Sequence, residues 1–156
     1  MVFIYVLKLS HNKFYIGKTS NPNIRIQNHF SQNMKAAIWT KLYKPIEIVE
    51  LISNCDEYDE EKYTLKYMDI YGIESVRGGY FSYPVLTSTQ IYFIKQMLRS
   101  INNKCLHCGL KDHFIKECPN KNIKKLNDQI PIKTTDQIPI NYFFNLLEQF
   151  IYPDLE

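Results

Sequence analysis

Apolar residues near the start of the chain cluster and alternate in the way typical of β-strands. Residues 3–7 form an apolar, β-branched run, a polar turn follows at 10–13, and a second strand is predicted to end at Gly17. Residues 46–52 alternate between apolar and polar side chains, which predicts a third strand. We therefore expect a small three-stranded antiparallel sheet that begins with a hairpin.

Helical patterns lie between and after these strands. Asn21 is a favourable N-cap with Pro22 just inside the first turn, so a helix should begin there. Residues 34–43 and 56–71 are also predicted to be helical, and Gly72 should end the second of these segments. The predicted fold class is α+β, with helices flanking the sheet.

The remainder of the chain divides into segments of different composition. A strong helix start at Thr87 precedes an apolar stripe, and a cluster of cysteines and histidines follows it. The sequence Asp-Gln-Ile-Pro-Ile occurs at 128–132 and again at 136–140, which favours an extended linker. We predict a folded domain over 1–83, a connecting helix over 84–103, a metal-binding module over 104–119, a linker over 120–140 and an amphipathic C-terminal helix and tail over 141–156.

Composition and charge favour a folded protein with one polyanion-binding region. The chain is 45% apolar and 14% aromatic, and it has neither a long apolar run nor a signal peptide. We therefore expect a soluble, intracellular protein with no membrane partner. Residues 85–127 carry a net charge of +6 and residues 128–156 a net charge of −4, so the basic middle is the part expected to meet nucleic acid.

Three side chains near the hairpin suggest a site that handles phosphate. Tyr15 lies on the second predicted strand, and helical spacing places Arg25 and His29 four residues apart on one face of the following helix. The alternative is a basic helix beside a hairpin, with His29 on the surface.

These residues stand in an order that resembles the GIY-YIG nuclease family. That name records two tripeptides on adjacent strands, which here are Phe3-Ile4-Tyr5 and Tyr15-Ile16-Gly17, followed by Lys18 and later by Arg25. Phe3 replaces the glycine of the first tripeptide, while the tyrosine that carries the chemistry is kept. The resemblance implies the same α+β architecture.

The resemblance also implies roles for the residues of the site. Tyr5 would act as the base that activates water, and Tyr15 would orient the water or the phosphate. Arg25 would neutralise the scissile phosphate, with His29 assisting it. A glutamate on a later helix would bind magnesium or manganese through oxygen.

The metal-binding glutamate is the point at which the sequence departs from the family. The apolar rhythm of the later helix places Thr64 in the carboxylate position, whereas Glu60 lies one turn earlier on the same face. Glu60 is our candidate ligand for the divalent cation. The alternative is that the acidic residues only stabilise the start of the helix, and the domain would then bind nucleic acid without cutting it.

Two further positions in the first domain are candidate nucleic-acid contacts. Lys18 follows the second tripeptide directly. Arg77 precedes Gly78 and Gly79, a segment that resembles one in a subset of GIY-YIG-like proteins that also carry a zinc knuckle. Arg77 would present its guanidinium on a tight turn, and a simple turn after the helix is the competing interpretation.

The cysteine cluster has the spacing of a metal site. Cys105, Cys108, His113 and Cys118 are separated by two, four and four residues, which resembles the CCHC zinc knuckle of retroviral nucleocapsids and cellular RNA-binding proteins. Three thiolates and one imidazole complete a tetrahedral zinc site, so the zinc should be structural. His107 is not expected to be a ligand. Metal binding would supply the folding energy of so short a segment.

The predicted knuckle keeps part of the surface needed to bind nucleic acid. Leu106 replaces the usual aromatic residue after the first cysteine, whereas Phe114 can stack on a base and Lys111 and Lys116 can contact phosphate. Single-stranded nucleic acid is the favoured ligand, and a protein contact is the alternative.

Three hypotheses follow for the whole chain. The first is a metal-dependent endonuclease, with DNA the favoured substrate and RNA an alternative, whose knuckle lengthens its residence on the substrate. The second is a nucleic-acid-binding protein that keeps the GIY-YIG fold without activity. The third is a scaffold whose C-terminal helix binds a protein partner or a second copy of the chain.

Overall fold

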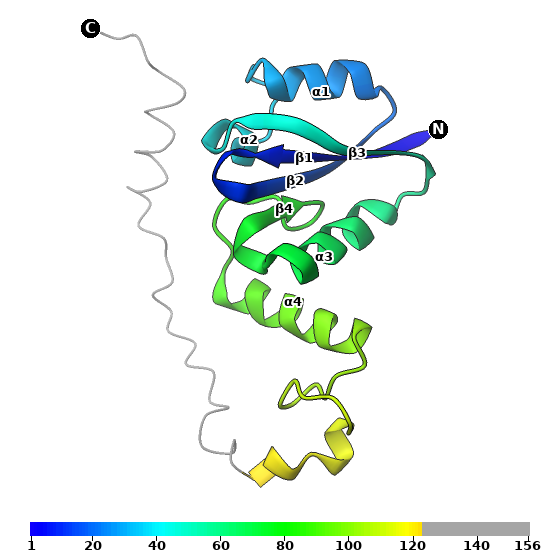
Figure 1. The fold of residues 1–156 in the computed structure, drawn as a ribbon, viewed down its shortest axis with the longest axis vertical. Helices are drawn as coiled ribbons and strands as arrows, with labels where there is room; N and C mark the ends of the chain where they lie inside the picture. The colour runs from blue at the N-terminus through cyan, green and yellow to red at the C-terminus, as the bar shows by residue number, and fades with distance from the viewer. Residues whose placement is uncertain (123–156) are drawn as a thin grey trace, which may run out of the picture.

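The computed structural model describes residues 1–122. The elements in order are β1 (Val2–Leu9), β2 (Lys13–Thr19), α1 (Pro22–Phe30), α2 (Ile38–Leu42), β3 (Pro45–Cys55), α3 (Asp59–Tyr71), β4 (Val76–Gly78) and α4 (Ser88–Ile101), with short 3-10 turns between and after them (Figure 1). The predicted repeat of the linker and the predicted C-terminal helix lie outside the described residues.

The sheet has four strands in the order β3-β1-β2-β4, so the prediction of three antiparallel strands is wrong in detail although the α+β class is confirmed. β1 pairs antiparallel with both β2 and β3. The strand that the sequence missed, β4, is three residues long and pairs parallel with β2, with Tyr15 opposite Arg77. So short a segment carries no alternating pattern of its own.

The two faces of the sheet bury different sets of side chains because successive residues of a strand point to opposite sides. Ile4, Val6 and Ile16 pack on the face that α3 and α4 cover. Tyr5 and Tyr15 lie on the opposite face, the face on which Figure 1 shows α1 and α2. The tyrosines therefore belong to a layer separate from the main apolar core.

Local signals set the ends of several helices as expected. The Asn21 side chain accepts a hydrogen bond from the backbone N–H of Ile24 at 3.3 Å, and Pro22 is the first residue of α1. Gly72 ends α3 with a φ of 88°, a conformation that favours glycine. Thr87 and Gln90 form a capping box at the start of α4.

Two helices are shorter than predicted because polar side chains compete for backbone groups at their starts. Asn33 accepts the backbone N–H of Lys35 at 2.9 Å, and only Ile38–Leu42 is helical within the predicted segment 34–43. Asp56 accepts the N–H groups of Tyr58 and Asp59, so α3 begins three residues later than predicted.

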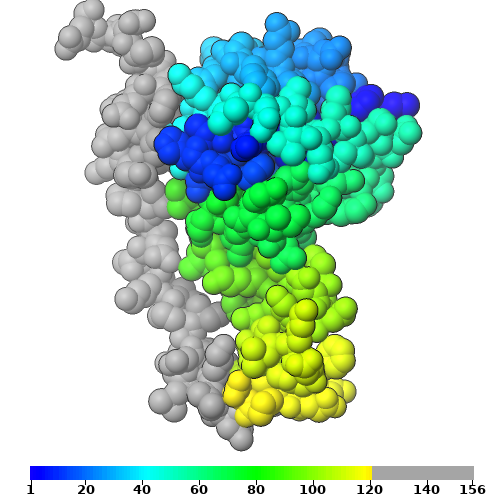
Figure 2. All heavy atoms as spheres, in the orientation of Figure 1, coloured from blue at the N-terminus to red at the C-terminus, as the bar shows by residue number. Residues whose placement is uncertain are grey.

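The described part of the chain is elongated. Figure 2 shows α1 at one end and the cysteine-rich module at the other. α4 carries the main core past residue 83, since Leu86 and Ile94 are buried in the same cluster as Ile4 and Ile16. Within residues 1–122, none of the helices is long and apolar enough to span a lipid bilayer.

Candidate active site

The rings of Tyr5 and Tyr15 form the floor of the candidate site. They lie on neighbouring strands and the same face of the sheet, with ring centroids 6.3 Å apart. The register places Gly17 opposite Tyr5, and a Cβ at Gly17 would lie 2.3 Å from the Tyr5 hydroxyl. Position 17 therefore requires glycine, because the ring of Tyr5 occupies the space that a side chain at this position would need.

Helix α1 supplies the two other predicted catalytic side chains. Nε2 of His29 lies 2.8 Å from the Tyr5 hydroxyl, and Nε of Arg25 donates to the same oxygen at 3.2 Å. The His29 ring also lies 5.1 Å from the ring of Tyr15. His29 is fully buried, so the alternative of a surface histidine is wrong.

Burial controls the protonation of these groups. It raises the pKa of Tyr5 and of Tyr15, and it outweighs the opposing charge of Arg25. The pKa of His29 is lowered to about 4 because burial and the charge of Arg25 both disfavour the imidazolium. The resting site at neutral pH therefore contains two neutral phenols, a neutral imidazole and one guanidinium.

Glu60 lies at the start of α3, close enough for its charge to raise the pKa of both tyrosines. The backbone N–H of Lys18 donates to its Oε1 at 3.2 Å, and the backbone of Gly79 forms a further hydrogen bond. Burial and the neighbouring Glu61 raise the pKa of Glu60, and the charge of Lys18 and the two backbone contacts oppose that shift. The carboxylate is thus held in a fixed orientation at the rim of the site.

Thr64, the other candidate for the metal position, is directed elsewhere. It is fully buried, and its hydroxyl donates to the backbone carbonyl of Glu60 at 2.7 Å. That hydroxyl also lies against Gly78, where an added Cβ would be 2.6 Å away. Thr64 therefore supports the helical turn that carries Glu60.

Lys18 has acidic neighbours in this structure. Its ammonium group lies 3.2 Å from Oε2 of Glu57 and 4.0 Å from Oε2 of Glu60. It lies at the end of β2, beside the candidate site, as its place in the sequence suggested. Its contact with nucleic acid stays a prediction.

A comparison with protein families bears on this arrangement of tyrosines, arginine and glutamate. Residues 1–67 match the family described as the GIY-YIG catalytic domain. This segment is a GIY-YIG domain. Such a domain implies nuclease-type activity, dependence on a metal ion and binding to nucleic acid. Neither the curated proteins nor the solved structures gave a match.

Arg77 follows the matched segment, and the expectation that it presents its guanidinium to nucleic acid is wrong. Its side chain is 2% exposed and lies over the ring of Trp39, 4.5 Å from the centroid. Its nitrogen atoms donate at 2.7–3.1 Å to the carbonyl oxygens of Ile73, Val76, Tyr83 and Pro84. Arg77 therefore joins the segment around β4 to α2, through its contact with the ring of Trp39.

The two glycines after Arg77 bring this segment against the site of the GIY-YIG domain. A Cβ at Gly78 would lie 2.6 Å from the carbonyl oxygen of Ile16, so β4 can approach β2 closely only with glycine. Gly79 has a φ of 48° and contacts Glu60 through its backbone. The Arg-Gly-Gly segment therefore supports Glu60 through the backbone of Gly79, in addition to the contact from Lys18.

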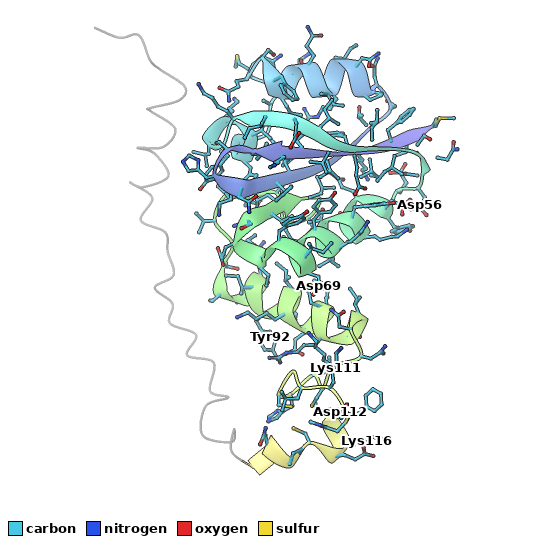
Figure 3. All side chains as sticks on the ribbon, viewed as in Figure 1. Asp56, Asp69, Tyr92, Lys111, Asp112 and Lys116 are labelled. Atoms are coloured by element: carbon cyan, nitrogen blue, oxygen red, sulfur yellow. The ribbon has the colours of Figure 1, made fainter. Side chains whose placement is uncertain are left out.

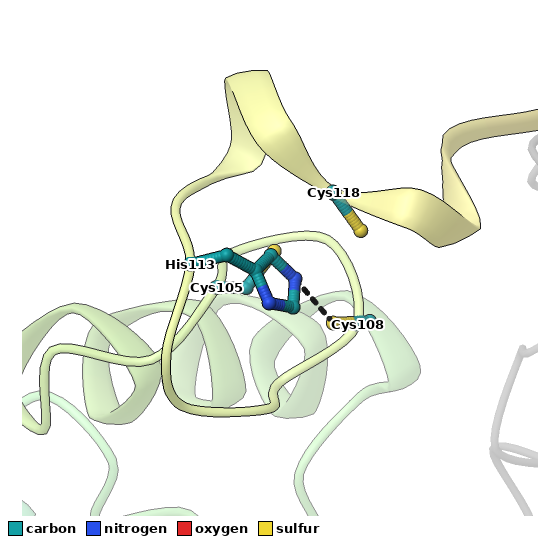
Figure 4. A group of neighbouring side chains, drawn as sticks. All are labelled: Cys105, Cys108, His113 and Cys118. Atoms are coloured by element: carbon teal, nitrogen blue, oxygen red, sulfur yellow. Dashed lines mark hydrogen bonds between the residues drawn. The ribbon is translucent and has the colours of Figure 1, made fainter.

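The four predicted zinc ligands converge in the module after α4 (Figure 4). One ligand atom from each of Cys105, Cys108, His113 and Cys118 lies within 4.8 Å of all the others. Cys108 Sγ and His113 Nε2 are 3.2 Å apart. Burial opposes ionisation of Cys105, yet hydrogen bonds from the backbone of Cys108 and His107 lower its pKa to about 6. Three sulfurs and one imidazole suit zinc.

The module is fastened to α4 through the backbone of its first loop. Nη1 of Arg99 donates to the carbonyl oxygens of Leu106 and His107 at 2.9 and 3.3 Å. Gly109, with a φ of 78°, turns the chain at this contact, and a Cβ there would lie 3.0 Å from Nε of Arg99. Sequence reasoning missed Arg99, because its position in α4 carries no metal-binding signal.

The side chains predicted to bind nucleic acid lie on the surface of the module. Phe114 is 67% exposed. Lys111 and Lys116 are exposed, and Figure 3 places them at the end of the molecule distant from α1. The surface that could meet nucleic acid at this module therefore combines an aromatic ring with positive charge.

Proposed function

We propose that this protein is a metal-dependent endonuclease that hydrolyses phosphodiester bonds in nucleic acid, with DNA the favoured substrate. The observation that carries the proposal is the convergence of Tyr5, Tyr15, Arg25 and His29 at one place within a GIY-YIG domain, with Glu60 at its rim. Hydrolysis needs a base for water and positive charge for the phosphate, and this group of side chains offers both.

Each side chain takes the role that its contacts favour. Tyr5 receives the proton of the attacking water, and Tyr15 orients the water or the phosphate beside it. Arg25 is half-buried and donates a hydrogen bond to the Tyr5 hydroxyl. Its charge therefore lies beside the proposed base, where a phosphate attacked by water would have to bind. His29 assists through its hydrogen bond to Tyr5.

Glu60 is the proposed ligand for Mg²⁺ or Mn²⁺. Its side chain is 14% exposed, so one side still faces solvent, and two backbone contacts hold it in place. Such ions bind through one or two carboxylates together with the oxygens of the substrate phosphate, which a single oriented glutamate satisfies. When bound, the ion would stabilise negative charge on the phosphate.

The zinc module is proposed to lengthen the residence of the enzyme on its substrate. A closed Cys3His site has no open position for catalysis, so zinc would serve to fold the loop. Phe114 would stack on an unpaired base, and Lys111 and Lys116 would contact phosphates.

Nicking of a supercoiled plasmid in the presence of Mg²⁺ or Mn²⁺ tests this function. Tyr5→Phe, Arg25→Ala and Glu60→Gln should each slow nicking by about 10²-fold or more. Tyr58→Phe and Glu47→Gln are matched controls at exposed positions and should cut at the normal rate. Tyr5→Phe, Glu60→Gln and the two control variants must keep their affinity for DNA, measured in EDTA.

Two outcomes would contradict the proposal. Nicking that survives both Tyr5→Phe and Arg25→Ala would remove the assignment of the site. Salt-sensitive binding to DNA with no nicking in either metal would favour the alternative, a nucleic-acid-binding protein that retains the GIY-YIG fold.

A further inference from the structure

Beneath α1, the buried side chain of Thr40 meets the side of His29 that faces away from Tyr5. We propose that Thr40 is a positioning residue. By fixing which ring nitrogen of His29 carries the proton, it makes the other nitrogen the acceptor for the Tyr5 hydroxyl. Sequence analysis singled out His29 but not Thr40, because the two residues lie on different helices, His29 on α1 and Thr40 on α2.

The hydroxyl of Thr40 has a single hydrogen, and its neighbours determine where that hydrogen points. Oγ1 lies 2.8 Å from the carbonyl oxygen of Ala37, an atom that can only accept. The hydrogen of Thr40 must therefore lie between these two oxygens, since two acceptors at that distance would repel. Oγ1 then has only lone pairs left for any other partner.

His29 is that other partner. Its Nδ1 lies 2.9 Å from Oγ1 of Thr40, so Nδ1 must carry the proton and donate it. A neutral imidazole has one N–H, which leaves Nε2 as a bare acceptor. Nε2 lies 2.8 Å from the Tyr5 hydroxyl, and Tyr5 therefore donates to His29.

Arg25 completes the orientation of the phenol. Its Nε donates to the Tyr5 oxygen at 3.2 Å, so that oxygen donates to His29 and accepts from Arg25. The groups around His29 are the rings of Tyr5 and Tyr15 and the charge of Arg25. The low pKa of His29 keeps its Nε2 free of a proton at neutral pH.

This arrangement provides an acceptor, Nε2 of His29, for the proton of Tyr5. Its role in catalysis rests on the proposed function. As water attacks phosphorus, the phenol proton passes to Nε2 of His29 and the water proton passes to the Tyr5 oxygen. The bond from phosphorus to the leaving oxygen breaks, and that oxygen takes a proton from solvent. His29 then releases its extra proton to solvent. With the opposite tautomer, an N–H would face the phenol and the first transfer could not occur.

Nitrogen-15 NMR of the full chain, without added divalent cation, reads the tautomer directly. In the native protein, Nδ1 of His29 should show the shift of a protonated nitrogen and Nε2 that of a bare one. Thr40→Val keeps the shape of the side chain but removes its acceptor, so the tautomer should change. Thr40→Ser should restore the native pattern, and Thr89→Val, on the exposed side of α4, should leave it unchanged.

Nicking provides the second measurement. Thr40→Val should lower kcat by about 10²-fold with little change in the affinity for DNA, and Thr40→Ser should recover most of the rate. A native His29 that is protonated on Nε2, or a tautomer that Thr40→Val leaves unchanged, would overturn the inference. If the tautomer behaves as described but the native protein never cuts, the proposed function fails while the role of Thr40 toward His29 stands.

Discussion

At the scale of single residues, the central question is how a buried phenol can act as a base. A free tyrosine has a pKa near 10, and burial raises the pKa of Tyr5 further. The resting phenol is therefore neutral, and the guanidinium of Arg25 only partly offsets the cost of ionising it. Tyr5 can take a proton from water only as it gives up its own, which is why its contact with His29 matters.

The low pKa of His29 makes a prediction about stability. Its pKa is about 4 in the folded protein against 6.5 in a free side chain. Between these values the unfolded chain binds a proton that the folded chain does not, so the free energy of unfolding should fall as the pH drops through that window. The loss should reach up to about 3 kcal/mol at pH 4, and this term should be constant above pH 7.

Urea unfolding at several pH values measures this effect. His29→Asn removes the titrating ring, so its free energy of unfolding should change less between pH 7 and pH 4 than that of the native protein. Glu60, whose raised pKa acts with the opposite sign, is present in both proteins and cancels. Parallel loss of stability in the two proteins would contradict the assignment of the shift to His29.

At the scale of elements, the sequence predicts the helix ends and the hairpin, because each depends on residues close together in the chain. The N-cap at Asn21, the glycine at the end of α3 and the capping box of α4 depend on residues within one helical turn, and each is present. The hairpin that carries Tyr5 and Tyr15 follows from its apolar runs and its turn. These are the elements that position the predicted side chains of the site.

Pairings distant in the chain could not be predicted in the same way. β4 forms because Val76–Gly78 pairs with β2, about sixty residues earlier in the chain. A segment of three residues is too short for its sequence to indicate that pairing. The role of Arg77 depends on Trp39 and on four carbonyl oxygens brought together by the fold. Thr40 was missed for the same reason, because its partner is on another helix.

Two glycines provide a test of how β4 supports the site. Gly78→Ala would place a Cβ 2.6 Å from the carbonyl oxygen of Ile16, so β4 must move and the protein should lose about 1–3 kcal/mol of stability. Because the Thr64 hydroxyl and Glu60 are packed against this segment, the variant should also bind Mn²⁺ more weakly, as measured by electron paramagnetic resonance.

Gly72→Ala is the matched control for that variant. Gly72 has a φ of 88° and a ψ of 148° but nothing within 4 Å of an added Cβ, so alanine costs about 1–3 kcal/mol through the backbone alone. Its affinity for Mn²⁺ should be that of the native protein. Equal effects of the two variants on Mn²⁺ binding would show that β4 does not support Glu60.

At the scale of the whole molecule, the cysteine-rich module is fastened to the domain that carries the candidate active site. Arg99 holds the module to α4 through two carbonyl oxygens. α4 in turn packs on the main core through Ile94, and the side chain of Asn102 at its end donates to Asp69 of α3 at 3.0 Å. A nucleic acid held by the module would thus lie in a defined direction from Tyr5.

Substitution of a predicted zinc ligand should unfold the cysteine-rich module and leave the sheet of the first domain folded. None of the four ligands belongs to the core of the sheet formed around Ile4 and Ile16. Cys105→Ser should therefore abolish zinc binding, measured by metal analysis, and broaden the amide signals of residues 104–119 in NMR spectra. Signals from the sheet should persist, and the affinity for single-stranded DNA should fall. Loss of the signals from the sheet as well would contradict this independence.

The most direct test of the account is the position of the divalent cation relative to the two tyrosines. Crystals soaked in Mn²⁺ should show an anomalous peak at the carboxylate of Glu60, on the side that faces Tyr5 and Tyr15. The peak should be absent from crystals of Glu60→Gln grown in the same form. A peak beside other residues, with Glu60 still bonded only to Lys18 and Gly79, would contradict the proposal that this carboxylate and the tyrosine pair form one hydrolytic site.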